Sequence, residues 1–170
     1  MATNLMDLAK GVLSDQLLGQ MGGILGNGGD TNKTKSLFET AAGSILGGLL
    51  KKSGTPQGRD DVYRQVQDHD DSILDRLGDL LGGGEPSPEL VNDGNSILDG
   101  VFGNERGGIM TTIAKALGLD EGIIGKLLMM AAPILMGVVG RHVKSKALDA
   151  VGLGNLLGEQ KSHIASSLPG

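Results

Sequence analysis

The stretch LLMMAAPILMGVVGRH, residues 127–142, decides how the rest of the sequence is interpreted. Its apolar residues cover several faces of a helix at once, which is typical of a helix buried on two sides. Lys126 and Arg141 bracket the apolar part, residues 127–140, which is shorter than the roughly 20 residues that a membrane-spanning helix needs. We therefore expect a central core helix here, with a membrane span as the alternative.

A second stretch, LFETAAGSILGGLLKK at residues 37–52, aligns with the first when the chain is shifted by 90 positions. Four of the aligned pairs are identical: Leu37/Leu127, Ala41/Ala131, Ala42/Ala132 and Gly47/Gly137. The preceding turns also match, because Gly28-Gly29-Asp30 lies over Gly118-Leu119-Asp120. The match predicts two duplicated helical units that stack to bury their apolar faces, and compositional bias is the alternative source of the match.

The expected fold class is all-α, because no segment alternates with the period of two that a strand requires. We predict a first helical unit at residues 1–82, a Gly/Pro-rich linker at 83–95, a second unit at 96–142 and a helical tail at 143–170. The helices expected within these parts run over residues 3–26 with a break after Ser14, from Thr34 or Ser36 to about Lys52, and over 58–67, 73–81, 96–102, 109–117, 121–140, 143–150 and 156–168.

Composition excludes several classes of protein. Aromatic residues make up 2% of the chain and the formal net charge is -5, whereas nucleic-acid binders use basic patches and aromatic stacking. The chain has no cysteine, so it contains no disulfide, thiolate nucleophile or Cys-type zinc site. The first residues lack the pattern of a secretory signal, so the predicted location is cytoplasmic.

Glycine accounts for 30 of the 170 residues, and many of these glycines lie inside apolar helical patterns. Each one costs a helix interior roughly 0.5–1 kcal/mol relative to alanine, which indicates that backbones approach closely there. The face opposite the expected core in residues 37–52, together with its match in the second copy, forms a stripe of small residues. We predict that the chain associates with itself at this stripe, and a solvated face is the alternative. The stripe consists of Ser36, Thr40, Gly43, Gly47 and Gly137.

The segment Asp68-His69-Asp70-Asp71 concentrates metal-type ligands. It lacks the alternating oxygens, glycine turn and later Glu of a hard-cation loop, so we expect a capped helix start, with a cation site as the alternative. The basic run at residues 141–146 suits a helix C-terminus. The aspartates at 60–79 and this basic run form solvated faces in one interpretation. In the other, the acidic segment of one protomer pairs head-to-tail with the basic run of the next. No catalytic, cofactor or metal residue is predicted.

Ordered motifs carry a resemblance to a known family. They are LAKG at 8–11, LLGQ at 17–20, ILGGLL at 45–50, DHD at 68–70 with SIL at 72–74, Gly94 with SIL at 96–98 and FG at 102–103, and APILMG at 132–137. Over most of residues 5–142 the chain resembles the bacterial domain-of-unknown-function family 937 and, more distantly, YidB-type proteins. Where the family pattern more often shows Gly-His-Ile, this chain has Asp99-Gly100-Val101, so the resemblance implies no histidine role there. It implies a glycine-rich helical protein and supplies no catalytic residues.

The function expected from these observations is that of a non-enzymatic, self-assembling or scaffold protein that acts through close helix–helix association. Its expected partner is a second copy of the chain, so that it forms a homo-oligomer. No nucleic acid and no cofactor is expected to bind. A protein of the membrane surface is the alternative, since exposed helices rich in Leu, Met and Gly bind lipid interfaces. An enzyme with an unrecognised site is the second alternative.

Overall fold

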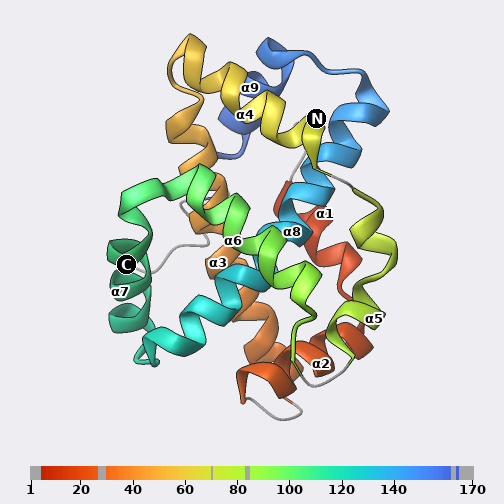
Figure 1. The fold of residues 1–170 in the computed structure, drawn as a ribbon, viewed down its shortest axis with the longest axis vertical. Helices are drawn as coiled ribbons and strands as arrows, with labels where there is room; N and C mark the ends of the chain where they lie inside the picture. Colours follow the sequence, from red (N-terminus) through yellow and green to blue (C-terminus); the bar gives the residue numbers. More distant parts are fainter. Residues whose placement is uncertain (1–4, 27–29, 70, 83–84, 162–163, 165–170) are drawn as a thin grey trace.

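A computed structural model describes the chain except residues 1–4, 27–29, 70, 83–84, 162–163 and 165–170. The fold is all-α, as the sequence predicts, and no strand occurs in the described part of the chain. Its elements are α1 (Leu5–Val12), α2 (Asp15–Leu25), α3 (Thr31–Lys52), α4 (Pro56–Asp68), the 3-10 helix η1 (Asp71–Asp75), α5 (Leu77–Leu81), α6 (Pro88–Phe102), the 3-10 helix η2 (Gly103–Glu105), α7 (Arg106–Leu117), α8 (Glu121–Lys146) and α9 (Ala150–Glu159). Figure 1 shows α8 passing through the middle of the molecule.

α8 is the centre of the core. Every residue from 131 to 140 is buried, and the helix packs against α1, α3, α4, α6, α7 and η1. Among the described helices it is the one long and apolar enough to cross a membrane, but 72% of its apolar window is buried inside the fold. A buried core helix passes the same test of length and composition. The structure therefore contains the core helix that the sequence predicts.

Pro133 lies inside α8 and changes how this helix meets α6. Proline has no N–H, so the carbonyl of Met129, four residues earlier, receives no helical hydrogen bond from it. That carbonyl faces Gly94 of α6, where an added Cβ would collide with the Met129 oxygen and lie 2.9 Å from Met129 Cγ. At Gly48 of α3 an added Cβ would lie 2.5 Å from Val101 Cγ1 of α6. At these two positions the close approach of helices requires glycine.

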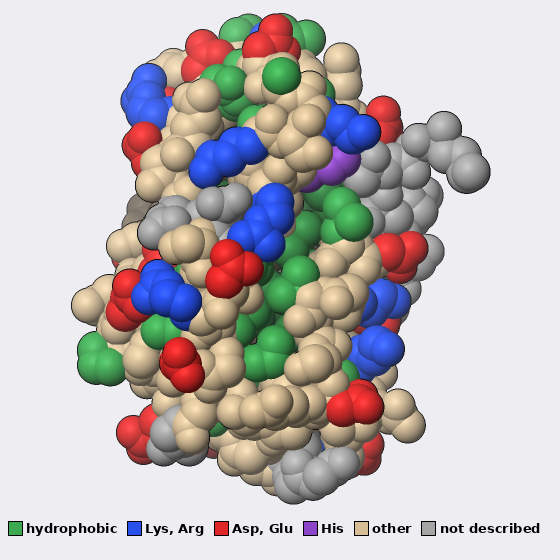
Figure 2. Space-filling model, turned by 90° about the vertical axis from the view of Figure 1, so that its right-hand side faces the viewer, with side chains coloured by type: hydrophobic (Ala, Val, Ile, Leu, Met, Phe, Trp, Pro, Cys, Tyr) green, Lys and Arg blue, Asp and Glu red, His purple; other side chains and the backbone are tan. Residues whose placement is uncertain are grey.

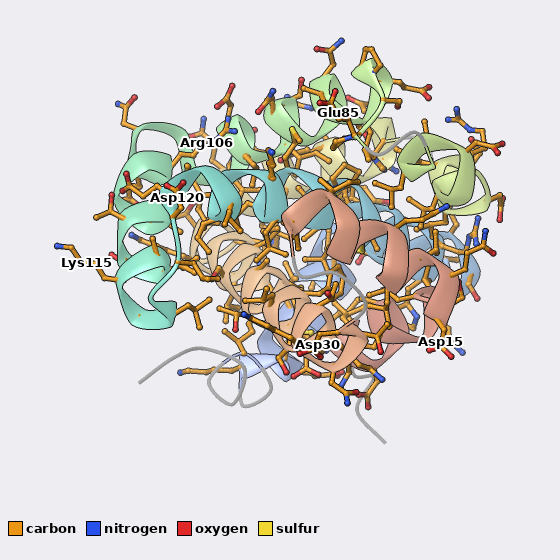
Figure 3. The ribbon with its side chains drawn as sticks, turned by 90° about the horizontal axis from the view of Figure 1, so that it is seen from below. Asp15, Asp30, Glu85, Arg106, Lys115 and Asp120 are labelled. Carbon is orange, nitrogen blue, oxygen red and sulfur yellow. The ribbon has the colours of Figure 1, made fainter. Side chains whose placement is uncertain are left out.

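Aspartates cap both long helices. The Asp30 carboxylate accepts a hydrogen bond from the Lys33 N–H at the start of α3, at 3.0 Å, and the Asp120 carboxylate accepts one from the Gly122 N–H at the start of α8, at 3.3 Å. Figure 3 labels the two caps, which are 90 positions apart, the offset of the predicted alignment. The duplication itself stays a prediction, and its turn residues 28 and 29 lie outside the described residues.

The start of α3 and the break near Ser14 test two local expectations. The expectation that Thr34 or Ser36 caps α3 is wrong, because α3 begins at Thr31 and the Asp30 side chain caps it. Thr34 is instead buried, and its hydroxyl donates to the Asp30 carbonyl at 3.1 Å. The break after α1 falls as predicted, and Ser14 Oγ caps α2 by accepting from the Leu17 N–H at 3.2 Å.

The predicted linker at residues 83–95 is wrong over its second half. α6 begins at Pro88, where the missing N–H costs nothing in a first helical turn, and Ser87 Oγ accepts from the Leu90 N–H at 3.3 Å. The two predicted units also share one continuous core, because α3 packs directly on α8 and α6 packs on both.

The C-terminal helices differ from expectation as well. α8 continues to Lys146 instead of ending at residue 140, and the predicted helix at 143–150 is broken at residues 147–149. α9 then covers Ala150–Glu159, ahead of the predicted start at 156. Its Leu153, Leu156 and Leu157 are buried, so this tail belongs to the core.

Candidate association surface

The small-residue stripe predicted for self-association packs mostly within the chain. Ser36 is exposed, but Thr40 is buried and its hydroxyl donates to the Ser36 carbonyl at 3.3 Å. Gly43 is buried, and Gly47 is half-buried, with an added Cβ 3.6 Å from Ile164 Cγ2. Gly137 is buried, and an added Cβ would lie 3.0 Å from a carbon of η1. The outward orientation expected for Gly43 is therefore wrong, and self-association at this stripe stays a prediction that only Ser36 and Gly47 could serve.

A groove on another face combines apolar walls with a cationic end. We call it the α1–α8 groove; it has a volume of about 220 Å³ and is lined by Leu8, Val12, Leu74, Val138, Arg141, His142 and Ser145. Hydrophobic surface runs along the middle of the face drawn in Figure 2, between charged side chains. Leu8 is 43% exposed, which is unusual among the large hydrophobic residues that the structure describes; Val151 of α9, at 52%, is the other one.

The groove exists because α1 is apolar on more than one side. Leu5, Met6 and Ala9 face the core, which leaves Leu8 and Val12, four residues apart, on a second face. The sequence predicts one helix over these residues and does not reveal the groove. The sequence feature that indicates the groove is the width of the apolar surface in residues 5–12, which is greater than the width of one buried helix face.

The cationic end of the groove is the C-terminal part of α8. Arg141 Nη2 lies 3.3 Å from Asp75 Oδ2 of η1, and both side chains are well exposed. Lys144 and Lys146 follow on exposed positions, where cations suit the negative end of the helix dipole. Part of the predicted pairing between the acidic and basic segments is therefore made within one chain, and the head-to-tail pairing of protomers stays a prediction.

The acidic segment at 68–71 lies between two helices, whereas the sequence predicts only a capped helix start there. Asp68 ends α4, and the His69 N–H caps that end by donating to the Val66 carbonyl at 3.3 Å. Asp71 begins η1, and residue 70 lies outside the described residues. α4 continues one residue beyond its expected end, so the segment contains a helix end as well as a helix start.

His69 makes the shortest polar contact of this region. Its Nε2 lies 2.6 Å from Asp93 Oδ2 of α6, and the residue is 9% exposed. The other ring nitrogen, Nδ1, is buried and has no hydrogen-bond partner among the described residues. The contact joins the end of α4 to the middle of α6. In the part of the chain that the structure describes, no group of three or more His, Asp or Glu side chains could hold a metal ion, so the predicted cation alternative gains no support.

An all-helical domain with a buried apolar α8 and an apolar surface groove defines the class of this protein. The chain belongs to the family of bacterial proteins of unknown function DUF937, which matches residues 7–142. The match includes α1 from residue 7 onward, α8 up to His142 and most of the α1–α8 groove, and it ends before α9. No curated protein and no solved structure was found to match the chain.

Proposed function

We propose that this protein is a non-enzymatic self-associating protein, and that the α1–α8 groove is where a second copy binds. The observation that carries the proposal is the exposed Leu8 on the rim of an apolar groove. Apolar surface that stays hydrated in a single chain gains free energy when a partner removes it from water. Scattered exposed leucines need no explanation, but a leucine that extends a concave apolar surface is typical of an interaction site.

Charge favours a second copy as the occupant. The groove ends in Arg141 and His142, while α4 and α5 expose the carboxylates of Asp60, Asp68 and Asp79. A chain with a net charge of -5 therefore presents anionic surface that complements the cationic end of the groove on another copy. Because groove and carboxylates are different surfaces, this contact is heterologous and generates a ring or a filament.

Sedimentation velocity over a wide range of concentrations tests the proposal. We expect association that strengthens with concentration, and we expect Leu8→Glu to abolish it, because a carboxylate there would have to be desolvated. Val151→Glu is the matched control, because it removes the other exposed large hydrophobic residue outside the groove. A wild-type chain that stays monomeric, or a Leu8→Glu variant that associates normally, contradicts the proposal.

The membrane surface is a second candidate, favoured by Arg141 at the end of an apolar groove and by the exposed Lys144 and Lys146 that follow it on α8. Basic side chains next to exposed apolar residues are typical of binding to anionic lipids. Co-sedimentation with vesicles of phosphatidylglycerol and phosphatidylcholine, compared with phosphatidylcholine alone, tests it. This candidate is supported if the protein binds only the anionic vesicles and the Leu8→Glu variant does not. It is contradicted if the protein binds neither kind of vesicle. We also propose that the protein is cytoplasmic and that it has no enzymatic activity.

A further inference from the structure

The junction of α8 and α9 carries a conflict between sequence and fold. Residues 141–151 contain neither glycine nor proline, so the sequence predicts an unbroken helix across 143–150. The chain nevertheless leaves the helix after Lys146, and Ala147 adopts φ 51° and ψ 45°. Within the described residues, Ala147 is the one non-glycine residue with a positive φ. Left-handed alanine is strained, so something other than local sequence holds this break.

Tertiary contacts of α9 hold it. Leu153 and Leu157 are fully buried, and α9 packs on α4 and α3. An added Cβ on Gly154 would lie 2.8 Å from Arg59 Cδ, which places this glycine directly against α4. Beyond α9, the side chain of Gln160 is fully buried. Its Oε1 accepts a hydrogen bond from the Leu5 N–H at 2.8 Å, which satisfies the first amide of α1.

Two local interactions also favour the break. Asp149 Oδ1 caps α9 by accepting from the Gly152 N–H at 2.7 Å, and the Tyr63 hydroxyl donates to the Leu148 carbonyl at 3.0 Å. A cavity of about 420 Å³ adjoins the junction and is lined by residues of α4 and α8 together with Ala147 and Leu148. The junction is therefore short and strained and lies beside a cavity, whereas α9 beyond it packs closely on α3 and α4.

We propose that α9 is exchanged between two copies of this chain. In the exchanged form α8 continues as one helix through residues 147–149, and α9 of each copy occupies the surface of α3 and α4 on the other. The packing of α9 on α3 and α4 is kept, while Ala147 returns to a right-handed helical conformation. This inference rests on the proposed self-association, because its partner is a second copy, but it uses the surface of α3 and α4 instead of the α1–α8 groove. Exchange of an identical element is a low-cost route to a dimer.

Engineered cysteines can detect the exchange directly, because the chain has none of its own. An Arg59→Cys chain and a Gly154→Cys chain are refolded together at high concentration and oxidised. We expect a disulfide-linked heterodimer that a reductant cleaves, since only exchange brings α4 of one copy against α9 of another. The control pair joins Lys115→Cys with Gly154→Cys, and Lys115 points away from the molecule on α7 (Figure 3). This pair should give no heterodimer. The double variant R59C/G154C at high dilution should close its disulfide within one chain.

Two junction variants move the equilibrium in opposite directions. Ala147→Gly relieves the strain of the break and should weaken the dimer, whereas Asp149→Ala removes the cap of α9 and should strengthen it. Each substitution changes the free energy of one junction by an amount that corresponds to about fivefold in the equilibrium constant. A dimer has two junctions, so its dissociation constant should shift roughly 25-fold. Oligomers that form without the Arg59–Gly154 cross-link, or variants that both leave the constant unchanged, overturn the exchange and leave the groove proposal standing. A wild-type chain that stays monomeric at every concentration overturns both.

Discussion

Replacing Gly94 with alanine tests the closest helix–helix contact in the molecule. The contact of α6 with α8 is the most extensive pairing between described elements. At its centre, an added Cβ on Gly94 would collide with the carbonyl oxygen of Met129 and lie 2.9 Å from Met129 Cγ. The Met129 side chain can rotate away, but the carbonyl is backbone inside a buried helix. The Gly94→Ala variant can therefore be accommodated only if α6 moves away from α8.

The two free-energy terms of this substitution have opposite signs. Alanine is favoured over glycine in a helix by about 1 kcal/mol. Overpacking of a dense core costs typically about 1–3 kcal/mol, and a collision with backbone belongs at the upper end of that range. We expect a net loss of about 2 kcal/mol, which for a chain of this size lowers the melting temperature by roughly 4–8 °C. Gly19→Ala in α2 is the matched control, because an added Cβ there meets no atom within 4 Å.

Thermal unfolding followed by circular dichroism at the helical band suits this chain, which has no tryptophan. Gly19→Ala should raise the melting temperature by roughly 2–4 °C, because it keeps the propensity gain without the collision. The opposite signs of the two variants are the result to look for. If Gly94→Ala melts at or above the wild-type temperature, the argument for close backbone approach at this contact is wrong.

Two further substitutions test buried polar contacts by the same measurement. Gln160→Ala leaves the Leu5 N–H without its acceptor and should cost about 1–3 kcal/mol, with faster hydrogen exchange of the Leu5 amide; an unchanged exchange rate would mean that the C-terminal segment does not hold α1. Asp93→Ala removes the partner of the buried His69 and should also cost about 1–3 kcal/mol, whereas Asp99→Ala, which breaks an exposed ion pair, should cost less than about 1 kcal/mol. Equal losses in the two aspartate variants would show that the contact with His69 does not stabilise the fold.

Helices with strong local signals were predictable from the sequence. The break after α1 has Ser14 as its cap, and α8 has an apolar surface on every side, so local chemistry and tertiary structure agree there. The start of α6 was equally readable, because Ser87-Pro88 is an N-cap followed by proline at the first helical position. The Gly/Pro/Ser composition of residues 82–88 favours a linker instead, which places the expected helix start at residue 96.

The candidate site was less predictable, because it depends on which faces remain uncovered after packing. Leu8 and Leu5 are the same residue type three positions apart, yet one is 43% exposed and the other fully buried. Gly19 and Gly94 both lie in helices, and only the position of Met129 on a neighbouring helix makes Gly94 intolerant of a side chain, whereas an added Cβ on Gly19 meets no atom within 4 Å. Such differences are properties of the pairing of elements, which a local pattern does not contain.

The junction at residues 147–149 differs from these cases, because there the sequence-based expectation remains physically reasonable. Local propensity favours helix through Ala147, and the fold breaks the helix so that Leu153 and Leu157 can reach the core of the same chain. A second copy offers those leucines the same surface without the strained alanine. The disagreement between local preference and observed structure is therefore the reason to expect two arrangements of one sequence, with concentration deciding between them.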